Sequence, residues 1–195
     1  MVAPSDGGGA LRHMTIPNIL SLIRLGMVPL FIVLALRGHH AAAFFVFVGA
    51  ALTDALDGYL ARRLNQTSRL GAFLDPAADK LLMVSGYIVY TIPWVATWTL
   101  PIWLTFTVFI RDLTLVVFVY LIYTRVRIRR FPPSIAGKVS TIVQVVVLAA
   151  TIASNTFIAP LTTPMLLWLH RLALVMTLYS GADYLRRWEI ALRRG

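Results

Sequence analysis

The sequence contains no cysteine, which excludes disulfide bonds and thiolate metal sites. Charged residues make up only 13% of its 195 residues, about half of the share that is usual in a soluble domain. Acidic residues are especially scarce, with eight Asp and Glu against 18 Lys and Arg, whereas hydrophobic residues make up 58%. A net charge of +10 would suggest nucleic-acid binding in a soluble protein, but the basic residues here lie between apolar runs. The composition therefore predicts a membrane protein that binds no nucleic acid.

Six apolar runs are each long enough, at about 20 residues, to cross a bilayer as a helix. They cover residues 16–36, 41–62, 72–92, 101–123, 134–154 and 160–185. The predicted fold is an all-α integral membrane protein with six transmembrane helices, forming one domain over residues 14–195. Residues 1–13 are polar and Gly-rich and are predicted to be a disordered tail. Asn18, Ser21 and Arg24 fall in the first half of the first run, which could instead begin as a short interfacial helix.

Positive charge alternates along the connections between these runs. Arg-rich segments follow the second, fourth and sixth runs, whereas the other three connections carry one Arg or none. The positive-inside rule then places both termini on the cytoplasmic side of the cell inner (plasma) membrane. Trp94, Trp98 and Trp103 would lie at the outer interface. The four histidines, at positions 13, 39, 40 and 170, are expected in the terminus, a loop and the membrane interface.

Half of the acidic residues lie in one short stretch, at Asp54, Asp57, Asp75 and Asp79. Each pair is three or four residues apart, so its members share a helix face. A short polar link joins the two helices, so four carboxylates can converge at one end of the membrane. Their repulsion is relieved by divalent cations, and hard oxygen ligands favour Mg²⁺ or Mn²⁺. Two such metals can clamp both oxygens of an in-line displacement at phosphorus.

Small residues accompany these acids. Gly58 and Ala61 leave a bare patch on the same helix, where a flat ligand could approach the backbone. A Gly inside a helix costs about 1 kcal/mol relative to Ala, so its presence needs a reason. Tight helix packing is the alternative explanation. Arg62 extends this face and could hold a phosphate.

The pattern DxxDGxxAR, eight further residues and GxxxDxxxD, from residue 54 to residue 79, resembles the full signature of the CDP-alcohol phosphotransferase family. The resemblance implies a six-helix membrane fold, usually in a homodimer, with a site that opens to the cytoplasm. It also implies transfer of a substituted phosphate from a CDP-linked donor to a hydroxyl, with release of CMP. By resemblance, Asp54, Asp57 and Asp75 would bind one divalent cation. Asp54, Asp75 and Asp79 would bind a second, and Asp79 would be the base for the incoming hydroxyl.

The resemblance also implies the donor site. The opening IPNILSLIRLGMVP is similar to that of bacterial members that make phosphatidylglycerol phosphate or cardiolipin, which use CDP-diacylglycerol. Gly58 and Ala61 would let the cytidine pack closely, Arg62 would hold the diphosphate, and Ser68 would lie near the nucleotide. The full set expected to bind CDP-diacylglycerol is Asn18, Ser21, Gly58, Ala61, Arg62, Ser68 and Gly71.

Two acceptors remain open. FIRDLTLV, with Arg111 and Asp112 inside an apolar run, resembles cardiolipin synthases of the family, whereas phosphatidylglycerol phosphate synthases carry Arg-Glu. FPPSIAGKVSTIVQ, which contains Lys138, also resembles the cardiolipin synthases, although the glycerol phosphate enzymes have a related segment. Arg111 and Lys138 are therefore predicted to bind the acceptor, which we expect to be phosphatidylglycerol. Glycerol 3-phosphate is the alternative acceptor. Structural pairing is the alternative role for Arg111, and contact with lipid head groups is the alternative role for Lys138.

Two other classes of protein, an ion-coupled transporter and a non-catalytic scaffold, could contain the same residues. Buried carboxylates can form an ion path in an ion-coupled transporter, but here all four lie at one end of the membrane. A non-catalytic scaffold could keep the fold, but every acid of the motif is intact. Metal-dependent release of CMP would exclude both readings.

Overall fold

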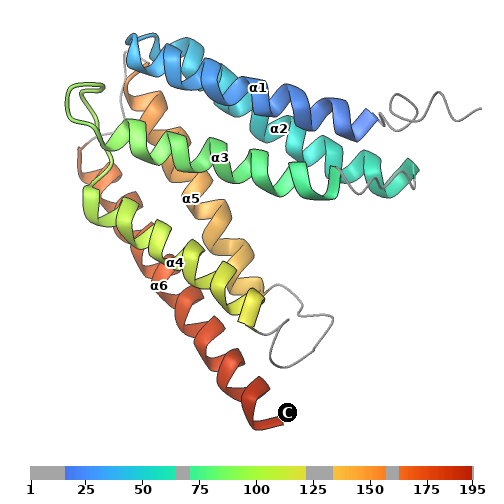
Figure 1. Cartoon of the computed structure of the whole chain (residues 1–195). Helices are drawn as coiled ribbons and strands as arrows, with labels where there is room; N and C mark the ends of the chain where they lie inside the picture. The colour runs from blue at the N-terminus through green and yellow to red at the C-terminus, as the bar shows by residue number, and fades with distance from the viewer. Residues whose placement is uncertain (1–15, 65–70, 122–133, 157–162, 195) are drawn as a thin grey trace, which may run out of the picture. The chain divides into compact units, whose positions relative to one another are not determined.

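The computed structural model describes residues 16–64, 71–121, 134–156 and 163–194, and the side chains of 19–53, 78–118, 134–156 and 163–186 within them. All of its regular secondary structure is helical. The six helices are α1 (Ile16–Leu36), α2 (His40–Leu64), α3 (Gly71–Thr91), α4 (Ile102–Leu121), α5 (Ile135–Ser154) and α6 (Thr163–Arg194) (Figure 1). The six predicted helices are thus confirmed. The chain divides into two compact units, Met1–Ser85 and Gly86–Gly195, which are considered separately below.

The first unit is built on a tight hairpin between α1 and α2, which lie side by side (Figure 1). The turn depends on Gly38, whose φ of 76° lies in the left-handed region that glycine adopts without strain. The amide of Gly38 donates to the carbonyl of Ala35 at 3.0 Å, and that of His39 donates to Leu34 at 2.9 Å. These bonds satisfy the last carbonyls of α1, so a glycine cap ends the helix.

Small and aromatic residues alternate where α1 meets α2. Ala35, Ala43 and Ala50 are fully buried, and small side chains let two helices approach closely. The rings of Phe31 and Phe47 fill the remaining space, with centroids 6.0 Å apart. This separation lies within the range of favourable aromatic pairs.

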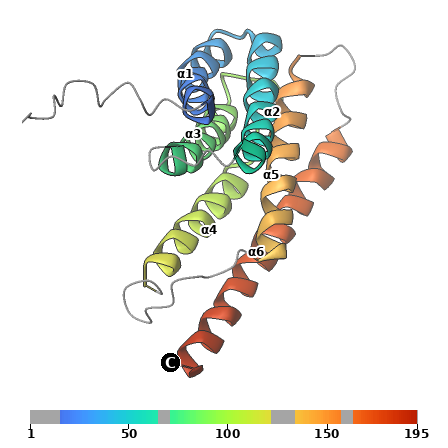
Figure 2. The ribbon, with the colours of Figure 1, turned by 90° about the vertical axis from the view of Figure 1, so that its right-hand side faces the viewer.

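In the second unit, α6 packs against both α4 and α5 (Figure 2). The last residues of α3 also belong to this unit and approach α5 at a glycine. A Cβ atom built on Gly86 would come within 2.5 Å of Leu148 Cδ2, so Ala at this position would displace that side chain. Leu148 and its neighbour Val147 are fully buried.

Polar side chains in this unit find partners on other helices. Tyr87 Oη donates to the carbonyl of Gln144 at 3.1 Å, and Gln144 Nε2 donates to Thr177 Oγ1 at 3.0 Å. The side chain of Asn155 fixes the α3–α4 connection, because it accepts from the amide of Trp98 at 2.9 Å and donates to its carbonyl at 2.8 Å. In an apolar environment these bonds satisfy groups that would otherwise be costly to bury.

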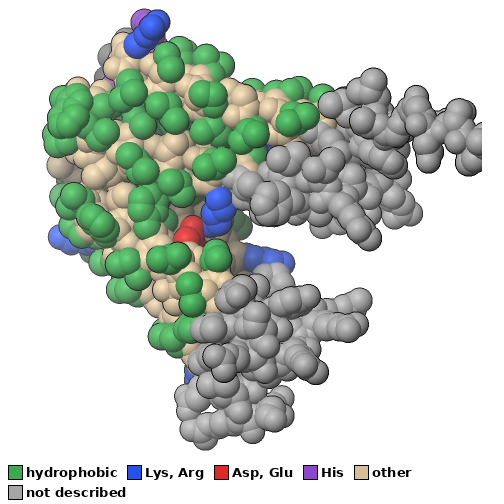
Figure 3. Space-filling model, viewed as in Figure 1, with side chains coloured by type: hydrophobic (Ala, Val, Ile, Leu, Met, Phe, Trp, Pro, Cys, Tyr) green, Lys and Arg blue, Asp and Glu red, His purple; other side chains and the backbone are tan. Residues whose placement is uncertain are grey.

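Apolar side chains cover much of the outer surface of the helices (Figure 3). Phe45, Leu113 and Val116 are each about two-thirds exposed. In the part of the chain that the structure describes, three segments are long and apolar enough to cross a membrane: Ile19–Leu36, Ile135–Ser154 and Thr163–Arg186. The chain is therefore a helical membrane protein, and six complete spans stay a prediction.

One helix end differs from the sequence-based expectation. The run expected to end at residue 185 continues as helix to Arg194, so α6 has 32 residues and a length of about 48 Å. That exceeds the roughly 30 Å hydrocarbon core of a bilayer. His170 lies near the start of α6 and is buried, with only 4% of its surface exposed, and its expected place at the membrane interface stays a prediction.

Candidate functional site

The Asp motif lies on two helices of the first unit. Asp54, Asp57, Gly58 and Ala61 all fall within α2. With 3.6 residues per turn, they lie within about 100° of one helix face, and Arg62 adjoins them. Asp75 and Asp79 follow on α3, four residues apart, and Gly71 is the first residue of that helix. The helical register required by the motif is therefore present on both helices.

Asp79 is the one motif acid whose side chain is described. It is partly buried, between the fully buried Ala78 and the exposed Lys80 on α3. The side chains of Asp54, Asp57 and Asp75 lie outside the described set, as do those of Gly58, Ala61, Arg62 and Gly71. Ser68 lies outside the described residues altogether.

Metal ligation can be judged from the chemistry of the donor set. The described side chains include no cluster of three His, Cys, Asp or Glu, but they leave out three of the four motif aspartates. Two same-face carboxylate pairs on α2 and α3 supply only oxygen donors, which suit Mg²⁺ or Mn²⁺. The residues therefore fit a divalent metal site, and the ligand set stays a prediction.

A buried polar pair lies on α1. Ser21 and Arg24 are each only 1% exposed, and Arg24 is among the largest fully buried side chains. A buried cation in an apolar helix is expensive and marks a functional candidate. The donor site predicted from the sequence did not include Arg24. Its position three residues after Ser21, on the same helix face, was the signal that could have identified it. Asn18 lies on the same helix, but its side chain is outside the described set.

Arg111 is the centre of a polar network in the second unit. Its Nη1 donates to Asp112 Oδ1 at 2.7 Å, and its Nη2 donates to Ser180 Oγ at 2.8 Å and to the carbonyl of Gly137 at 3.3 Å. The guanidinium, in a residue only 7% exposed, thus joins α4 to α5 and α6. The structure therefore shows that Arg111 pairs with Asp112, the structural role that the sequence left open. Contact with an acceptor stays a prediction for this residue.

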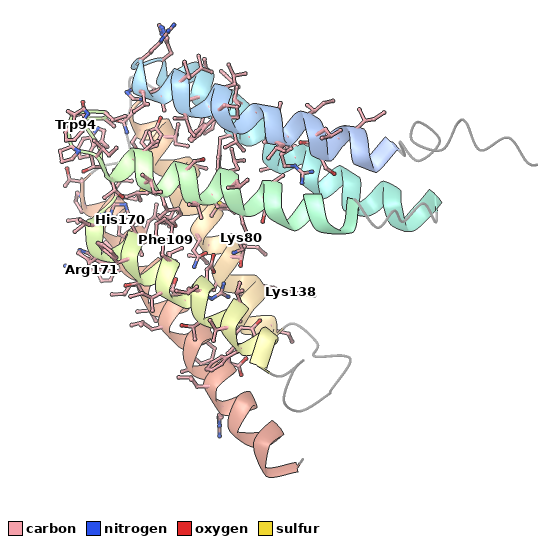
Figure 4. All side chains as sticks on the ribbon, viewed as in Figure 1. Lys80, Trp94, Phe109, Lys138, His170 and Arg171 are labelled. Carbon is pink, nitrogen blue, oxygen red and sulfur yellow. The ribbon has the colours of Figure 1, made fainter. Side chains whose placement is uncertain are left out.

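Lys138 follows Gly137 in the first turn of α5 and is exposed (Figure 4). Ser134 caps this helix, because its Oγ accepts from the amide of Gly137 at 2.9 Å. A cation close to the positive end of a helix dipole suits an anionic ligand. A Cβ on Gly137 would lie 2.7 Å from Tyr184 Oη, so α6 packs directly on this turn. Ser180 and Tyr184 could not be identified from the sequence, because single polar residues in an apolar helix form no motif.

Comparison with known proteins identifies the family. Residues 14–179 match the family described as CDP-alcohol phosphatidyltransferase. Together with the helical fold, this match defines the class of the protein as a helical membrane protein of a phosphatidyltransferase family. The chain belongs to the CDP-alcohol phosphatidyltransferase family, which confirms the resemblance carried by the Asp motif.

The chain is similar to relatives that carry two different enzyme names. A putative cardiolipin synthase of Mycobacterium bovis is 39% identical over 133 residues, which are 67% of this chain and 60% of the relative. A cardiolipin synthase (CMP-forming) of Streptomyces coelicolor is 42% identical over 141 residues, 67% of this chain and 61% of the relative. A probable phosphatidylglycerophosphate synthase of Mycobacterium tuberculosis is 36% identical over 189 residues, 92% of this chain and 84% of the relative.

Proposed function

We propose that this protein transfers a phosphatidyl group from CDP-diacylglycerol to phosphatidylglycerol, releasing CMP and forming cardiolipin. The observation that carries the reaction type is the intact Asp motif, set in helical register on α2 and α3 within the segment that matches the family. Four acids in a chain that has only eight are concentrated at this motif.

In the proposed reaction, Asp54, Asp57, Asp75 and Asp79 would hold two divalent cations, Mg²⁺ or Mn²⁺. When bound, such cations offset the charge of the diphosphate and make CMP a better leaving group. Arg62 orients the diphosphate. A carboxylate oxygen of Asp79 takes the proton from the acceptor hydroxyl as its oxygen attacks the phosphatidyl phosphorus. The bond from this phosphorus to the CMP oxygen then breaks.

The nucleotide and lipid ends of the donor need different surroundings. Gly58 and Ala61 leave room on α2 for the cytidine ring, and Ser68 and Gly71 follow at the link and at the start of α3. Asn18 and Ser21 on α1 contact the donor from the neighbouring helix, since α1 packs against α2.

Phosphatidylglycerol is favoured as the acceptor by residues of the second unit. Arg111 and Asp112 form the ion pair at 2.7 Å, so the Arg-Asp pattern typical of the cardiolipin synthases is a formed structural element. Lys138 provides an exposed cation near the acceptor phosphate. Relatives named cardiolipin synthase reach 39% and 42% identity. Glycerol 3-phosphate is the second candidate, because the relative named phosphatidylglycerophosphate synthase matches 92% of the chain.

The proposal includes a location and an assembly. The alternation of Arg-rich and uncharged connections supports six spans in the inner (plasma) membrane, with both termini and the Asp motif on the cytoplasmic side. The family resemblance suggests a homodimer.

A turnover assay tests the reaction. Purified protein in detergent would receive CDP-diacylglycerol, Mg²⁺ or Mn²⁺, and either phosphatidylglycerol or glycerol 3-phosphate. We expect CMP release with phosphatidylglycerol and none after chelation of the metal. Release with glycerol 3-phosphate alone would replace the proposed acceptor. Absence of release with either acceptor, from protein that is folded, would favour a non-catalytic scaffold.

A further inference from the structure

A groove lies between α4 and α6 in the second unit, with a volume of about 420 Å³. Its walls are Thr107, Ile110, Arg111 and Thr114 of α4 and Thr177, Leu178, Gly181, Ala182 and Leu185 of α6. Both sets recur at helical spacing, so each forms one continuous face. The volume lies within the usual range for small-molecule sites.

Each of the three threonine hydroxyls of the groove already makes a hydrogen bond within the protein. Thr107 Oγ1 donates to the carbonyl of Trp103 at 2.7 Å, and Thr114 Oγ1 donates to Ile110 at 2.6 Å. Thr177 Oγ1 accepts from Gln144 Nε2. These threonines therefore need no polar partner in the groove, and the other walls are aliphatic apart from Arg111. A hydrocarbon occupant fits this lining better than a nucleotide or a sugar does.

The dimensions also suit a hydrocarbon chain. Thr107–Thr114 and Thr177–Leu185 each extend roughly 11 Å along their helix axes. That length and a volume of about 420 Å³ accommodate part of one extended acyl chain. The neighbouring surface is apolar: Ile110, Leu178 and Leu185 are each more than half exposed.

Arg111 connects the groove to a charged region. Its Nε atom is buried and has no hydrogen-bond partner among the residues that the structure describes. Its Nη2 contacts the carbonyl of Gly137, the residue before the exposed Lys138. An anionic phosphodiester beside this groove would therefore lie close to one buried guanidinium and one exposed cation.

We propose that this groove binds an acyl chain of the phosphatidylglycerol acceptor, with the lipid head group held near Arg111 and Lys138. The inference rests on the proposed function, and it explains how the enzyme would prefer a lipid acceptor. Glycerol 3-phosphate has no chain and would leave the groove unused.

The test fills the groove without disturbing the helix. A Cβ on Gly181 meets nothing within 4 Å, so Gly181→Leu places its side chain in open space. Gly26→Leu is the matched control, because Gly26 is exposed on α1 and a Cβ there also meets nothing within 4 Å. Both changes replace a helical Gly by a better helix former, so neither is expected to lower stability.

Phosphatidylglycerol with a photoreactive diazirine on its acyl chain is the probe, in phosphatidylcholine nanodiscs without CDP-diacylglycerol or metal. We expect labelled peptides from α4 and α6, and competition by unlabelled phosphatidylglycerol but not by added phosphatidylcholine. Gly181→Leu should lower this labelling about tenfold, since its side chain displaces several methylenes from the groove. Gly26→Leu should leave the labelling unchanged.

Three labelling or cross-linking results would overturn the inference. They are labelling that survives Gly181→Leu, equal competition by phosphatidylcholine, and a disulfide between two copies through Ala182→Cys, which would show that a second chain covers the groove. These three measurements do not depend on turnover. If the groove is labelled specifically but only glycerol 3-phosphate is consumed, the proposed acceptor is wrong and the lipid site stands. If Gly181→Leu keeps the wild-type KM for phosphatidylglycerol, the groove assignment fails and the reaction stands.

Discussion

Replacing Arg111 by Met should destabilise the second unit by an amount that its contacts allow us to estimate. The guanidinium bonds to Asp112, Ser180 and the carbonyl of Gly137, and its side chain is 6% exposed. Removing one member of a fully buried ion pair costs roughly 3–5 kcal/mol. Asp112 is 18% exposed and can be partly hydrated, so the expected loss is lower, about 2–3 kcal/mol. For a chain of this size that lowers Tm by roughly 4–12 °C.

The assay is thermal unfolding in one detergent at fixed pH. Arg37→Met is the control, because Arg37 is exposed in the α1–α2 turn, and its change should stay within about 0.5 kcal/mol. The double variant Arg111→Met with Asp112→Leu should recover at least half of the loss, since no unpaired carboxylate is then left near the interior. If Arg111→Met unfolds at the wild-type temperature, the network does not hold α4 to α5 and α6.

The remaining predictions concern the Asp motif and the first turn of α5. Asp79→Asn should keep the wild-type Tm and lower kcat by roughly 10²–10⁴-fold, because it removes the base; a near-wild-type rate would refute that role. Asp54→Asn should lose activity together with its dependence on Mg²⁺ or Mn²⁺, measured as CMP release across a metal titration, and an unchanged metal titration would remove Asp54 from the ligand set. Gly137→Ala should cost about 1–3 kcal/mol in unfolding measurements, because its Cβ would approach Tyr184 Oη to 2.7 Å. Tyr184→Phe in the same protein should recover part of that loss, and no recovery would place the strain elsewhere.

The helices could be located from the sequence because apolar runs of bilayer length are a strong signal. The run predicted over 16–36 coincides with α1, and the run over 134–154 differs from α5 by one residue. The end of α6 was missed because hydropathy marks where an apolar run stops, not where a helix stops. Residues 186–194 contain four Arg together with Glu, Ala and Leu, which are all good helix formers, and Gly195 is the first helix breaker after them.

The site could be predicted only where the residues form a local pattern. The Asp motif is readable because its acids recur at helical spacing within 26 residues. The network around Arg111 joins residues 69 positions apart on different helices, so no local pattern reports it. Arg24 on α1 shows the same limit, because its burial depends on tertiary packing rather than on a local pattern.

The central claim is that phosphatidylglycerol accepts the phosphatidyl group. The most direct measurement supplies the purified protein with CDP-diacylglycerol, divalent metal, deuterated phosphatidylglycerol and ¹³C-labelled glycerol 3-phosphate together, and identifies the lipid products by mass spectrometry. The account predicts deuterated cardiolipin in amounts equal to the CMP released. Phosphatidylglycerol phosphate that carries ¹³C, without deuterated cardiolipin, would contradict it.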